Sequence, residues 1–461
     1  MTSYAEFTAA ELAEATGGCW RNNLIPAGNW KLNTDSRSIQ AGECFIPIVG
    51  ERFNGHDFLA ELPAGVIALA EPQYPVPCNL PVLEVADTLN AYQALARFHR
   101  LRMKNLQIAA VTGSVGKTSV KEMLRAIFTA AAGAEHVLYT IGNTNNQIGV
   151  PQNLLRLTPD IKYAVIEMGT NHHGEISPLS LTALPDTAII NTIAACHLEH
   201  LGTLEGVAQE KSAIFNGLNP HGTAVYPQEC AGVEVIKQAA EAFKQARFGN
   251  TASAAISAEY IAGSLNGSRV ALTFHSSGKR LEFDWKLTGV HQAENASAAA
   301  AAAEALNIAP EIIVQGLQQT ELPGKRMNST VVNNCCWIND AYNANPHSMK
   351  SSLRCIKDNA DPDSKLLLVL GDMLELGSDE ERYHGEILQF VRENFAGFDY
   401  QLLLLGKRFR AAAEKSAGIS KCLIFDTLED LQTALPRLRQ PGMTVFLKSS
   451  NSVGLSKIEP C

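Results

Sequence analysis

Residues 111–119, Val-Thr-Gly-Ser-Val-Gly-Lys-Thr-Ser, place two glycines, a lysine and several hydroxyl groups within one turn. Gly113 and Gly116 allow the backbone to curl so that successive N–H groups face an anion. Lys117 can reach the terminal phosphates of a nucleotide, and the Thr118 hydroxyl can hold Mg²⁺. The spacing therefore predicts a phosphate-binding loop. Its expected phosphate-binding residues are Gly113, Ser114, Gly116, Lys117, Thr118 and Ser119.

The segments on either side of this loop favour the same interpretation. The apolar run Ile108–Val111 predicts a buried strand, and Val120–Phe128 predicts a helix whose positive dipole end faces the turn. The match is incomplete, because the common Gly-x-x-x-x-Gly-Lys pattern has a glycine where this chain has Val111. A strand–turn–helix corner that binds no nucleotide therefore stays open as the alternative.

Ionisable residues follow other apolar runs. Glu167 ends one run, where it could hold Mg²⁺ through oxygen or be an ordinary strand-end acid. His197 and His200 could suggest zinc, but no cysteine or carboxylate stands at a matching spacing, so a core or capping role stays open for His197. Taken alone, Lys211 has the pattern of a solvated helix residue.

Amide side chains are concentrated in two places. Asn143, Asn145 and Asn146 follow a glycine, and they suit either a polar, phosphorylated or peptidic ligand or a plain turn. Asn295 stands near the start of an alanine-rich helical stretch, where it could contact an adenine edge or be an ordinary helix residue. Asp340 follows a strand-like run and resembles the acid that holds a ribose hydroxyl in dinucleotide-binding sheets.

The elements that must position these residues fall into three blocks, which we predict at residues 1–104, 105–322 and 323–461. The first is rich in turn residues and is closed by a helix over 88–103. The second alternates helical segments with apolar runs, which predicts a mostly parallel sheet; the runs are Ile108–Val111, Tyr163–Met168, Thr187–Thr192 and Thr223–Tyr226. The alternation restarts in the third block with Lys365–Leu370, Leu402–Leu405 and Thr444–Lys448. Ligands of such sheets bind beyond the carboxyl ends of the strands.

Composition narrows the function classes. The chain has 461 residues and a formal net charge of −9, and we find no cluster of lysines and arginines with interleaved aromatic residues of the kind that binds nucleic acid, which argues against that partner. Its apolar runs are too short to cross a bilayer, and Met1–Glu6 has no secretion signal, so we expect a cytoplasmic protein without a membrane partner. The ten cysteines include no Cys-x-x-Cys pair, so reduced thiols are expected.

Read together, these segments resemble the Mur ligase family, and the resemblance covers most of the chain. The Asp-Ala-Tyr-Asn-Ala-Asn-Pro string is its most discriminating part. The matching segments are Asp35–Arg37, Gly50–His56, Gly142–Val150, Glu167–Gly169, Asp340–Met349 and Leu370–Gly377. The resemblance implies three domains: a small α/β N-terminal domain that binds a UDP-sugar, a central parallel-sheet phosphate-loop ATPase domain, and a C-terminal Rossmann-like ligase domain.

The resemblance also implies an activity. The family consists of ATP-dependent acid–amino-acid ligases, or peptide synthases, of cell wall biogenesis, which serve cell shape and cell division. Within the family, the segments favour the enzyme that joins D-alanyl-D-alanine to UDP-N-acetylmuramoyl-tripeptide through an acyl phosphate, in peptidoglycan precursor synthesis. We expect ATP and two Mg²⁺ ions as cofactors, and a monomer.

Site residues are carried over at the matching positions. The catalytic residues implied are Lys117, Lys211 and His197. Mg²⁺ would be held by Thr118, Glu167, His197 and Lys211, the last carbamylated by CO₂. ATP would also contact Asn295 at adenine, Arg326 at phosphate and Asp340 at ribose. The substrates would meet Ser36, Arg37, Asn143, Asn145, Asn146, Asn343 and Asn345, with the first two near the uridine diphosphate.

The chain departs from the family at Gln292, where asparagine is usual, and at Lys448–Asn451, where Lys-Gly-Ser-Arg is usual. These departures keep open a catalytically weakened paralogue that binds a UDP-sugar peptide. A related Mur or folylpolyglutamate-type ligase is a second alternative, although the latter type lacks the first block. A phosphate-loop NTPase switch is a third, and Val111 speaks against it because such switches carry the full glycine pattern.

Overall fold

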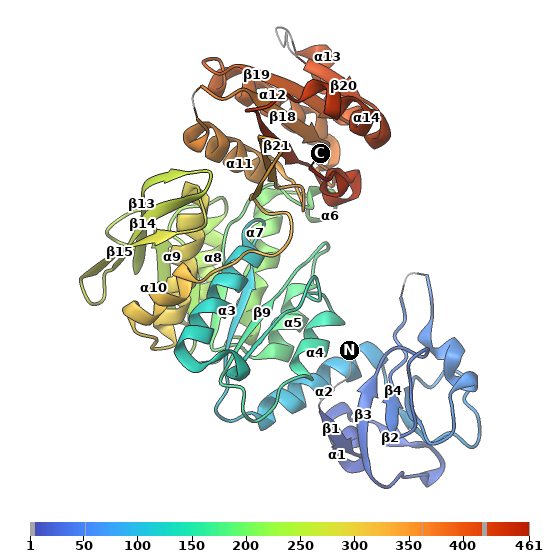
Figure 1. Cartoon of the computed structure of the whole chain (residues 1–461). Coiled ribbons are helices and arrows are strands. Elements are labelled where there is room, and N and C mark those ends of the chain that lie inside the picture. The colour runs from blue at the N-terminus through green and yellow to red at the C-terminus, as the bar shows by residue number, and fades with distance from the viewer. Residues whose placement is uncertain (1–4, 51, 362, 417–421, 461) are drawn as a thin grey trace.

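A computed structural model describes residues 5–50, 52–361, 363–416 and 422–460 (Figure 1). The chain forms three sheets in succession, one at each end of the molecule and the largest between them (Figure 1). This arrangement confirms the predicted α/β class with three domains. Met1–Tyr4, on which the expectation about a secretion signal partly rests, lie outside the described residues, as do Glu51 of the 50–56 segment and Cys461.

The first sheet has six short strands in the order β1-β3-β4-β5-β6-β2. These strands are β1 (Glu6–Thr8), β2 (Cys19–Trp20), β3 (Asn29–Asn33), β4 (Glu43–Phe45), β5 (Ile67–Ala70) and β6 (Val82–Glu84). Helix α1 (Ala9–Thr16) begins with a capping box between Thr8 and Glu11. Helix α2 (Thr88–Arg102) then leads to the central sheet, as the sequence predicts.

The central sheet has nine strands in the order β15-β14-β13-β12-β11-β10-β7-β9-β8. The strands from β7 to β12 run parallel, which confirms the prediction for this block. They are β7 (Gln107–Thr112), β8 (Val137–Tyr139), β9 (Tyr163–Glu167), β10 (Thr187–Ile190), β11 (Thr223–Pro227) and β12 (Lys244–Gly249). The helices among them are α3 (Lys117–Ala132), α4 (Gly149–Leu154), α5 (Ile176–Ala183), α6 (Leu198–Leu201), α7 (Leu204–Ser212) and α8 (Val233–Ala240).

An antiparallel meander extends this sheet, and the sequence patterns did not predict it. It consists of β13 (Ile256–Ser264), β14 (Gly267–Phe274) and β15 (Lys279–Trp285). Helices α9 (Val290–Ala305) and α10 (Pro310–Gln318) follow and lie beside it (Figure 1). Residues Ala298–Ala303 of α9 are all buried, so the small alanine side chains let this helix approach the sheet closely.

Both faces of the central sheet are buried, and this fixes the position of the loop after β7. Side chains alternate across a strand, so Ile108 and Ala110 pack into one core while Ala109 and Val111 pack into the other. Helix α3 buries a stripe at helical spacing against the second core: Val120, Met123, Leu124, Ile127 and Phe128. The turn between β7 and α3 is thereby held at both ends.

The third sheet has the order β16-β17-β21-β18-β19-β20, with only β16 antiparallel to its neighbour. Its strands are β16 (Asn328–Val332), β17 (Cys335–Asn339), β18 (Leu366–Gly371), β19 (Tyr400–Leu405), β20 (Cys422–Phe425) and β21 (Thr444–Lys448). Its helices are α11 (Pro346–Asn359), α12 (Glu380–Asn394), α13 (Lys407–Lys415) and α14 (Leu428–Leu438). The restart of strand–helix alternation in the third block is confirmed.

Two absences hold within the described part of the chain. None of its helices is long and apolar enough to cross a membrane. Its nine cysteines are all free, as expected from their spacing.

Candidate active site

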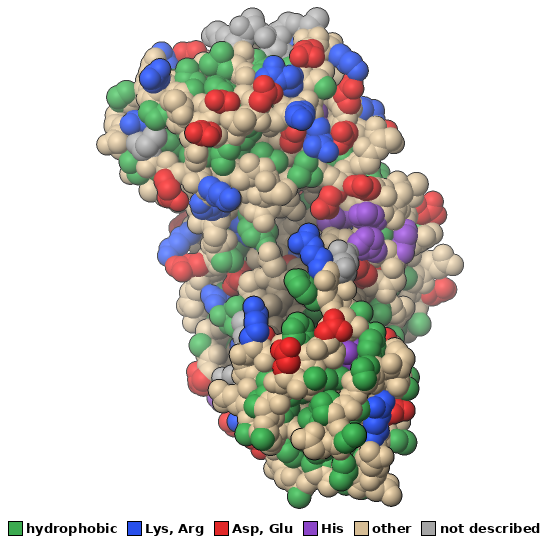
Figure 2. Space-filling model, turned by 90° about the vertical axis from the view of Figure 1, so that its right-hand side faces the viewer, with side chains coloured by type: hydrophobic (Ala, Val, Ile, Leu, Met, Phe, Trp, Pro, Cys, Tyr) green, Lys and Arg blue, Asp and Glu red, His purple; other side chains and the backbone are tan. Residues whose placement is uncertain are grey.

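A cleft of about 600 Å³ is lined mainly by residues of the central and C-terminal domains, and a loop of the N-terminal domain reaches its edge. Figure 2 shows the hollow in the middle of one face, with histidine side chains gathered at its rim. Ile48, Val49 and Leu89 line it from the N-terminal side, while the remaining walls come from the other two sheets. The predicted site residues that line it are Ser114, Gly116, Lys117, Thr118, Ser119, Asn143, Asn145, Asn146, Glu167, His197, Asn295, Arg326, Asp340, Asn343 and Asn345.

The turn between β7 and α3 has the backbone that its glycines predict. Gly113 has φ 149° and Gly116 has φ 80°, which side chains with a Cβ rarely adopt. Helix α3 begins at Lys117, three residues before the predicted start at Val120, because Lys117 already belongs to the first helical turn. The Lys117 ammonium lies over the turn and donates to the Gly113 carbonyl at 2.7 Å.

Oxygen ligands converge beside this turn. The Thr118 hydroxyl donates to one oxygen of Glu167 at 3.0 Å, and the Asn145 amide donates to the other at 3.0 Å. Glu167 ends β9, the neighbour of β7, and its backbone N–H donates to the Thr140 hydroxyl at 2.9 Å. The Glu167 side chain is 3% exposed, so the interpretation of Glu167 as a surface acid is wrong.

The C-terminal domain reaches across the cleft to the same turn. The Arg326 guanidinium donates to the Thr118 hydroxyl at 3.1 Å and lies 3.7 Å from the centre of the Tyr342 ring. The Tyr342 hydroxyl donates to the Asn143 side chain. The buried Nε of Arg326 has no hydrogen-bond partner among the described residues. Such an orphaned donor is costly unless a ligand accepts from it.

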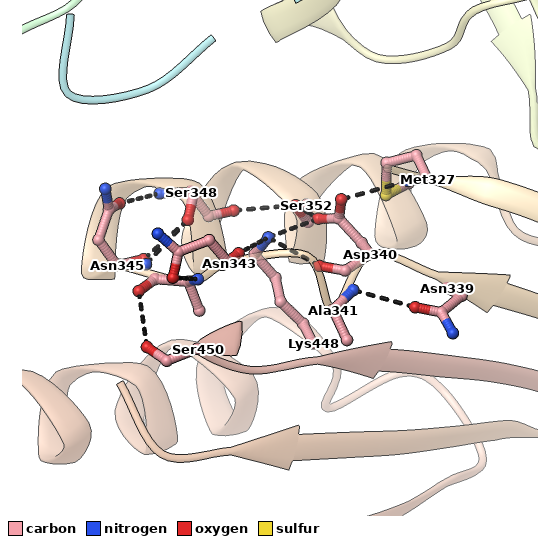
Figure 3. Close-up of polar contacts among 11 residues, drawn as sticks. Met327, Asn339, Asp340, Ala341, Asn343, Asn345, Ser348, Ser352, Lys448 and Ser450 are labelled. Carbon is pink, nitrogen blue, oxygen red and sulfur yellow. Dashed lines mark hydrogen bonds and ion pairs between the residues drawn. The ribbon is translucent and has the colours of Figure 1, made fainter. Parts of the chain in front are cut away.

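Figure 3 shows how the Asp340–Asn345 string is held. Asp340 accepts from the Lys448 ammonium at 2.6 Å, from the Ser352 hydroxyl at 2.6 Å and from a backbone N–H. Lys448 also donates to the Asn343 carbonyl at 3.2 Å. The Ser450 hydroxyl donates to the Ala344 carbonyl at 3.2 Å. The departures in the Lys448–Asn451 segment therefore leave this string anchored to β21.

His197 connects the central and C-terminal domains. Its Nδ1 lies 2.6 Å from a carboxylate oxygen of Glu375, and this contact lowers the pKa of Glu375. Both residues have left-handed backbones, with φ 52° at His197 and φ 63° at Glu375. His200 instead contacts His172, with ring centres 4.3 Å apart and the ring planes tilted by 43°. The described residues contain no group of three His, Cys, Asp or Glu that could hold a metal, so the zinc alternative has no support.

Lys211 lies in α7 behind the cleft wall and is 1% exposed. The expectation of a solvated helix residue, drawn from its position alone, is wrong, because this face of α7 packs into the core. Burial is the main cause that lowers the pKa of Lys211 to about 8; the positive charge of Lys117 acts in the same direction, whereas Cys196 and Glu210 act to raise it. Lys211 makes no hydrogen bond or ion pair within the described residues. Its amine is therefore available to react in the neutral form.

Some predicted residues are not brought to the cleft, and others have local structural roles. Ser36 and Arg37 lie outside it, and the Arg37 side chain pairs with Asp35 at 2.8 Å in solvent. The Asn146 side chain accepts from the backbone N–H of Gly149 at 2.9 Å, as a turn residue does. The Asn345 side chain caps α11. Both amides still line the cleft.

The sequence patterns assigned no role to two residues of the site. Tyr342 belongs to the discriminating Asp-Ala-Tyr string, but nothing in its type indicated that Arg326 would stack on its ring. Asn191 follows β10, where ligand-binding residues are expected, yet it was given no role. Its amide donates to the Val115 carbonyl at 2.9 Å, inside the phosphate-binding turn.

Comparison with known proteins extends this picture. Residues 111–303 match the Mur ligase middle domain, and residues 325–451 match the Mur ligase, glutamate ligase domain. The UDP-N-acetylmuramoyl-tripeptide–D-alanyl-D-alanine ligase of Escherichia coli K12 is 34% identical, with 93% of this chain and 92% of the relative aligned. The solved MurF of Acinetobacter baumannii superposes with a TM-score of 0.90 at 32% identity, over 98% of both chains. That of Thermotoga maritima, solved with ADP, has a TM-score of 0.79 at 21% identity, over 92% of this chain and 95% of that one.

Three α/β domains around a phosphate-binding turn define an ATP-dependent ligase that forms amide bonds. The full-length relative at 34% identity places the chain within this class. The chain belongs to the Mur ligase family.

Proposed function

We propose that this protein joins D-alanyl-D-alanine to UDP-N-acetylmuramoyl-tripeptide at the expense of ATP, in peptidoglycan precursor synthesis. One observation carries the proposal: the phosphate-binding turn, Glu167 and Arg326 face one cleft that also receives the N-terminal domain. The full-length relative with this activity, 34% identical, supports the choice of substrates. The work of such an enzyme lies in the cytoplasm, where its nucleotide substrates are found.

The residues of the cleft fit ATP. The two glycines give the turn its positive-φ backbone, and Lys117 extends over it. The orphaned Nε of Arg326 supplies a donor for a phosphate oxygen. Asp340 is held in place on the C-terminal side of the cleft, near which the ribose would lie.

The residues also fit Mg²⁺, which prefers oxygen ligands and often takes one or two carboxylates together with phosphates. The Thr118 hydroxyl and the Glu167 carboxylate are 3.0 Å apart and would hold one ion. His197 lies farther along the cleft and would serve a second ion, together with a carbamate on Lys211. When bound, these ions would neutralise charge on the transferred phosphoryl group.

The carbamate proposal rests on the chemistry of Lys211. Only a neutral amine attacks CO₂, and burial lowers the pKa of Lys211 to about 8, so a useful fraction is neutral near physiological pH. The attack forms an N–C bond and releases one proton. It turns a buried neutral amine into a carbamate, whose negatively charged oxygens can face a metal ion.

The reaction follows from activation of a carboxylate. An oxygen of the terminal carboxylate of the tripeptide attacks the γ-phosphorus of ATP, and the bond to the bridging oxygen breaks to release ADP. The amine of D-alanyl-D-alanine then attacks the acyl carbon and loses a proton, and inorganic phosphate leaves. Lys117 and Arg326 stabilise charge during the first step. Contacts across the cleft exclude the water that would hydrolyse the acyl phosphate.

The substrate peptide would lie along the amide-rich wall of Asn143, Asn145 and Asn146, with Asn343 and Asn345 opposite. The uridine diphosphate would lie toward the N-terminal domain, where Arg37 is exposed to solvent and Ser36 is half-buried. Arg37 would exchange its ion pair with Asp35 for a phosphate.

The proposal is tested by phosphate release from ATP with a matrix of UDP-muramoyl peptides and dipeptides. We expect release only when a UDP-muramoyl tripeptide and D-alanyl-D-alanine are both present. Lys117→Ala should reduce the rate by roughly 10³-fold or more, the scale found for groups that stabilise a transferring phosphoryl, while Lys244→Ala, an exposed lysine on β12, serves as the control. Equal release without the peptide and dipeptide would refute the ligase function.

A further inference from the structure

We propose that Asn191, Asn295 and Gln292 form an amide relay that holds the phosphate-binding turn in the shape that accepts a nucleotide, with Asn191 as the positioning residue. The inference deepens the proposed function and rests on it, because it assigns the turn to nucleotide binding. It also gives the Asn295 side chain a role in addition to the adenine contact that the family resemblance implies.

The relay is a continuous chain of hydrogen bonds. The Asn191 Nδ2 donates to the Val115 carbonyl at 2.9 Å and to the Asn295 Oδ1 at 2.7 Å. The Asn295 Nδ2 then donates to the Gln292 Oε1 at 3.1 Å. The exposed fractions of Asn191, Asn295 and Gln292 are 2%, 6% and 5%, so water competes little for these groups.

The polarity of the relay is fixed by its first member. A backbone carbonyl can only accept, so the nitrogen of Asn191 must face Val115. This nitrogen also faces Asn295, which must then present its oxygen and direct its own nitrogen to Gln292. Each amide is thereby oriented by the one before it, from the turn to the first turn of α9.

The relay acts on the part of the turn where orientation matters most. A carbonyl that faced an incoming phosphate would repel it, and the donor on Asn191 engages the Val115 carbonyl instead. The same side chains lie directly against Gly116, where an added Cβ would overlap Asn191 Nδ2 and Asn295 Oδ1. The turn therefore packs its backbone onto the relay, and loss of the relay would allow the turn to change shape.

The test measures ADP binding by calorimetry, together with the KM values for ATP and for the dipeptide. Asn191→Leu keeps the branched shape but removes the donor without adding charge. We expect the affinity for ADP to fall, and the KM for ATP to rise, by roughly tenfold each, because one buried hydrogen bond is lost. The KM for the dipeptide should stay within about twofold. A merely structural role would not separate the two KM values.

The control is Asn394→Leu, which also removes an amide that donates to a backbone carbonyl, but in α12, away from the cleft. It should leave ADP binding unchanged. If Asn191→Leu does not fold, Gln292→Met decides the matter, because it removes the last acceptor of the relay while keeping the chain length. Unchanged ADP binding by a folded variant would overturn the relay and leave the proposed function standing. Failure of the unaltered protein to bind ADP would instead refute the proposed function.

Discussion

Lys211 and His291 are two residues whose surroundings change their chemistry. The sequence alone marks neither as unusual, yet Lys211 is buried and His291 is half-buried in the cleft wall, and loss of solvent lowers the pKa of each, to about 8 for Lys211 and to about 4 for His291. The proposed reactivity with CO₂ is a property of Lys211, and the expected response of stability to pH is a property of His291. Each can be tested with one substitution.

We expect turnover to fall in CO₂-free buffer and to recover when bicarbonate is added, because the neutral amine of Lys211 would regain its carbamate. Lys211→Ala should lose activity and should not respond to bicarbonate. Phosphate release measures both effects. Unchanged turnover without CO₂ would remove the carbamate proposal and leave the ligase proposal standing.

The stability of the protein should fall as the pH drops from about 6.5 toward 4. In this window the unfolded chain protonates His291, whereas the folded chain keeps it neutral, so the unfolded state binds more protons. The free energy of unfolding should therefore lose up to about 1.4 kcal/mol per pH unit from this group. Urea unfolding at several pH values would measure the slope.

His291→Gln should flatten that slope, whereas His221→Gln, at an exposed histidine, should leave it unchanged. An equal slope in His291→Gln and the unaltered protein would mean that other groups cause the acid sensitivity.

Prediction from sequence was strongest where residue type and chemistry coincide. Gly113, Gly116, Lys117 and Thr118 were recognised because a phosphate-binding turn requires those types at that spacing. Asn191 lies at the end of the Thr187–Thr192 run, where ligand-binding residues are expected, but its role could not be predicted, because an asparagine after a strand has many uses and only the fold places it 2.9 Å from the Val115 carbonyl. The burial of Lys211 could not be predicted either, since a single lysine does not reveal which face of its helix is packed.

At the scale of elements, the periodicity of apolar residues predicted the strands and helices that pack into the cores. The strands buried on both faces and helix α3 carry strong patterns, so their existence was predicted with small errors at the ends. The β13–β15 meander was missed because one of its faces is exposed and its strands are polar on that face. The strands of the first sheet were missed because most have only two to four residues.

The turn between β7 and α3 should not tolerate a side chain at Gly116. Gly116→Ala would force a Cβ into Asn191 and Asn295 at φ 80°, so the turn must move. We expect at least a tenfold loss of ADP affinity, consistent with a few kcal/mol of strain. Calorimetry with ADP checks this. Gly397→Ala, at a glycine with open space around it, is the control, and equal affinity in the two variants would contradict the expectation.

At the scale of the whole molecule, side chains of the cleft connect the central and C-terminal domains. Arg326 reaches Thr118, Tyr342 reaches Asn143, and His197 pairs with Glu375. The sequence could not predict these contacts, because they depend on how two separately folded units are docked. The predicted domain boundaries near residues 104 and 322 remain predictions.

Glu375→Gln should shift the nucleotide-free protein toward a more open arrangement, because it removes the charge that pairs with His197. The Glu375 side chain is about half exposed, so the pair contributes about 0.2–1 kcal/mol and the open population should rise by about 1.4-fold to fivefold. Small-angle X-ray scattering would detect this as a larger radius of gyration. Glu414→Gln, at an exposed residue of α13, should leave the scattering curve unchanged, and an unchanged curve for Glu375→Gln would show that this pair does not hold the domains.

The walls of the cleft come from three separately folded parts of the chain. An inhibitor therefore need not resemble a reactant. A compact molecule that binds between two of these walls would inhibit the enzyme by holding the domains apart. Substitutions that confer resistance to such a compound could occur on either wall. A compound that binds only to the glycine turn would contact residues whose substitution should impair nucleotide binding.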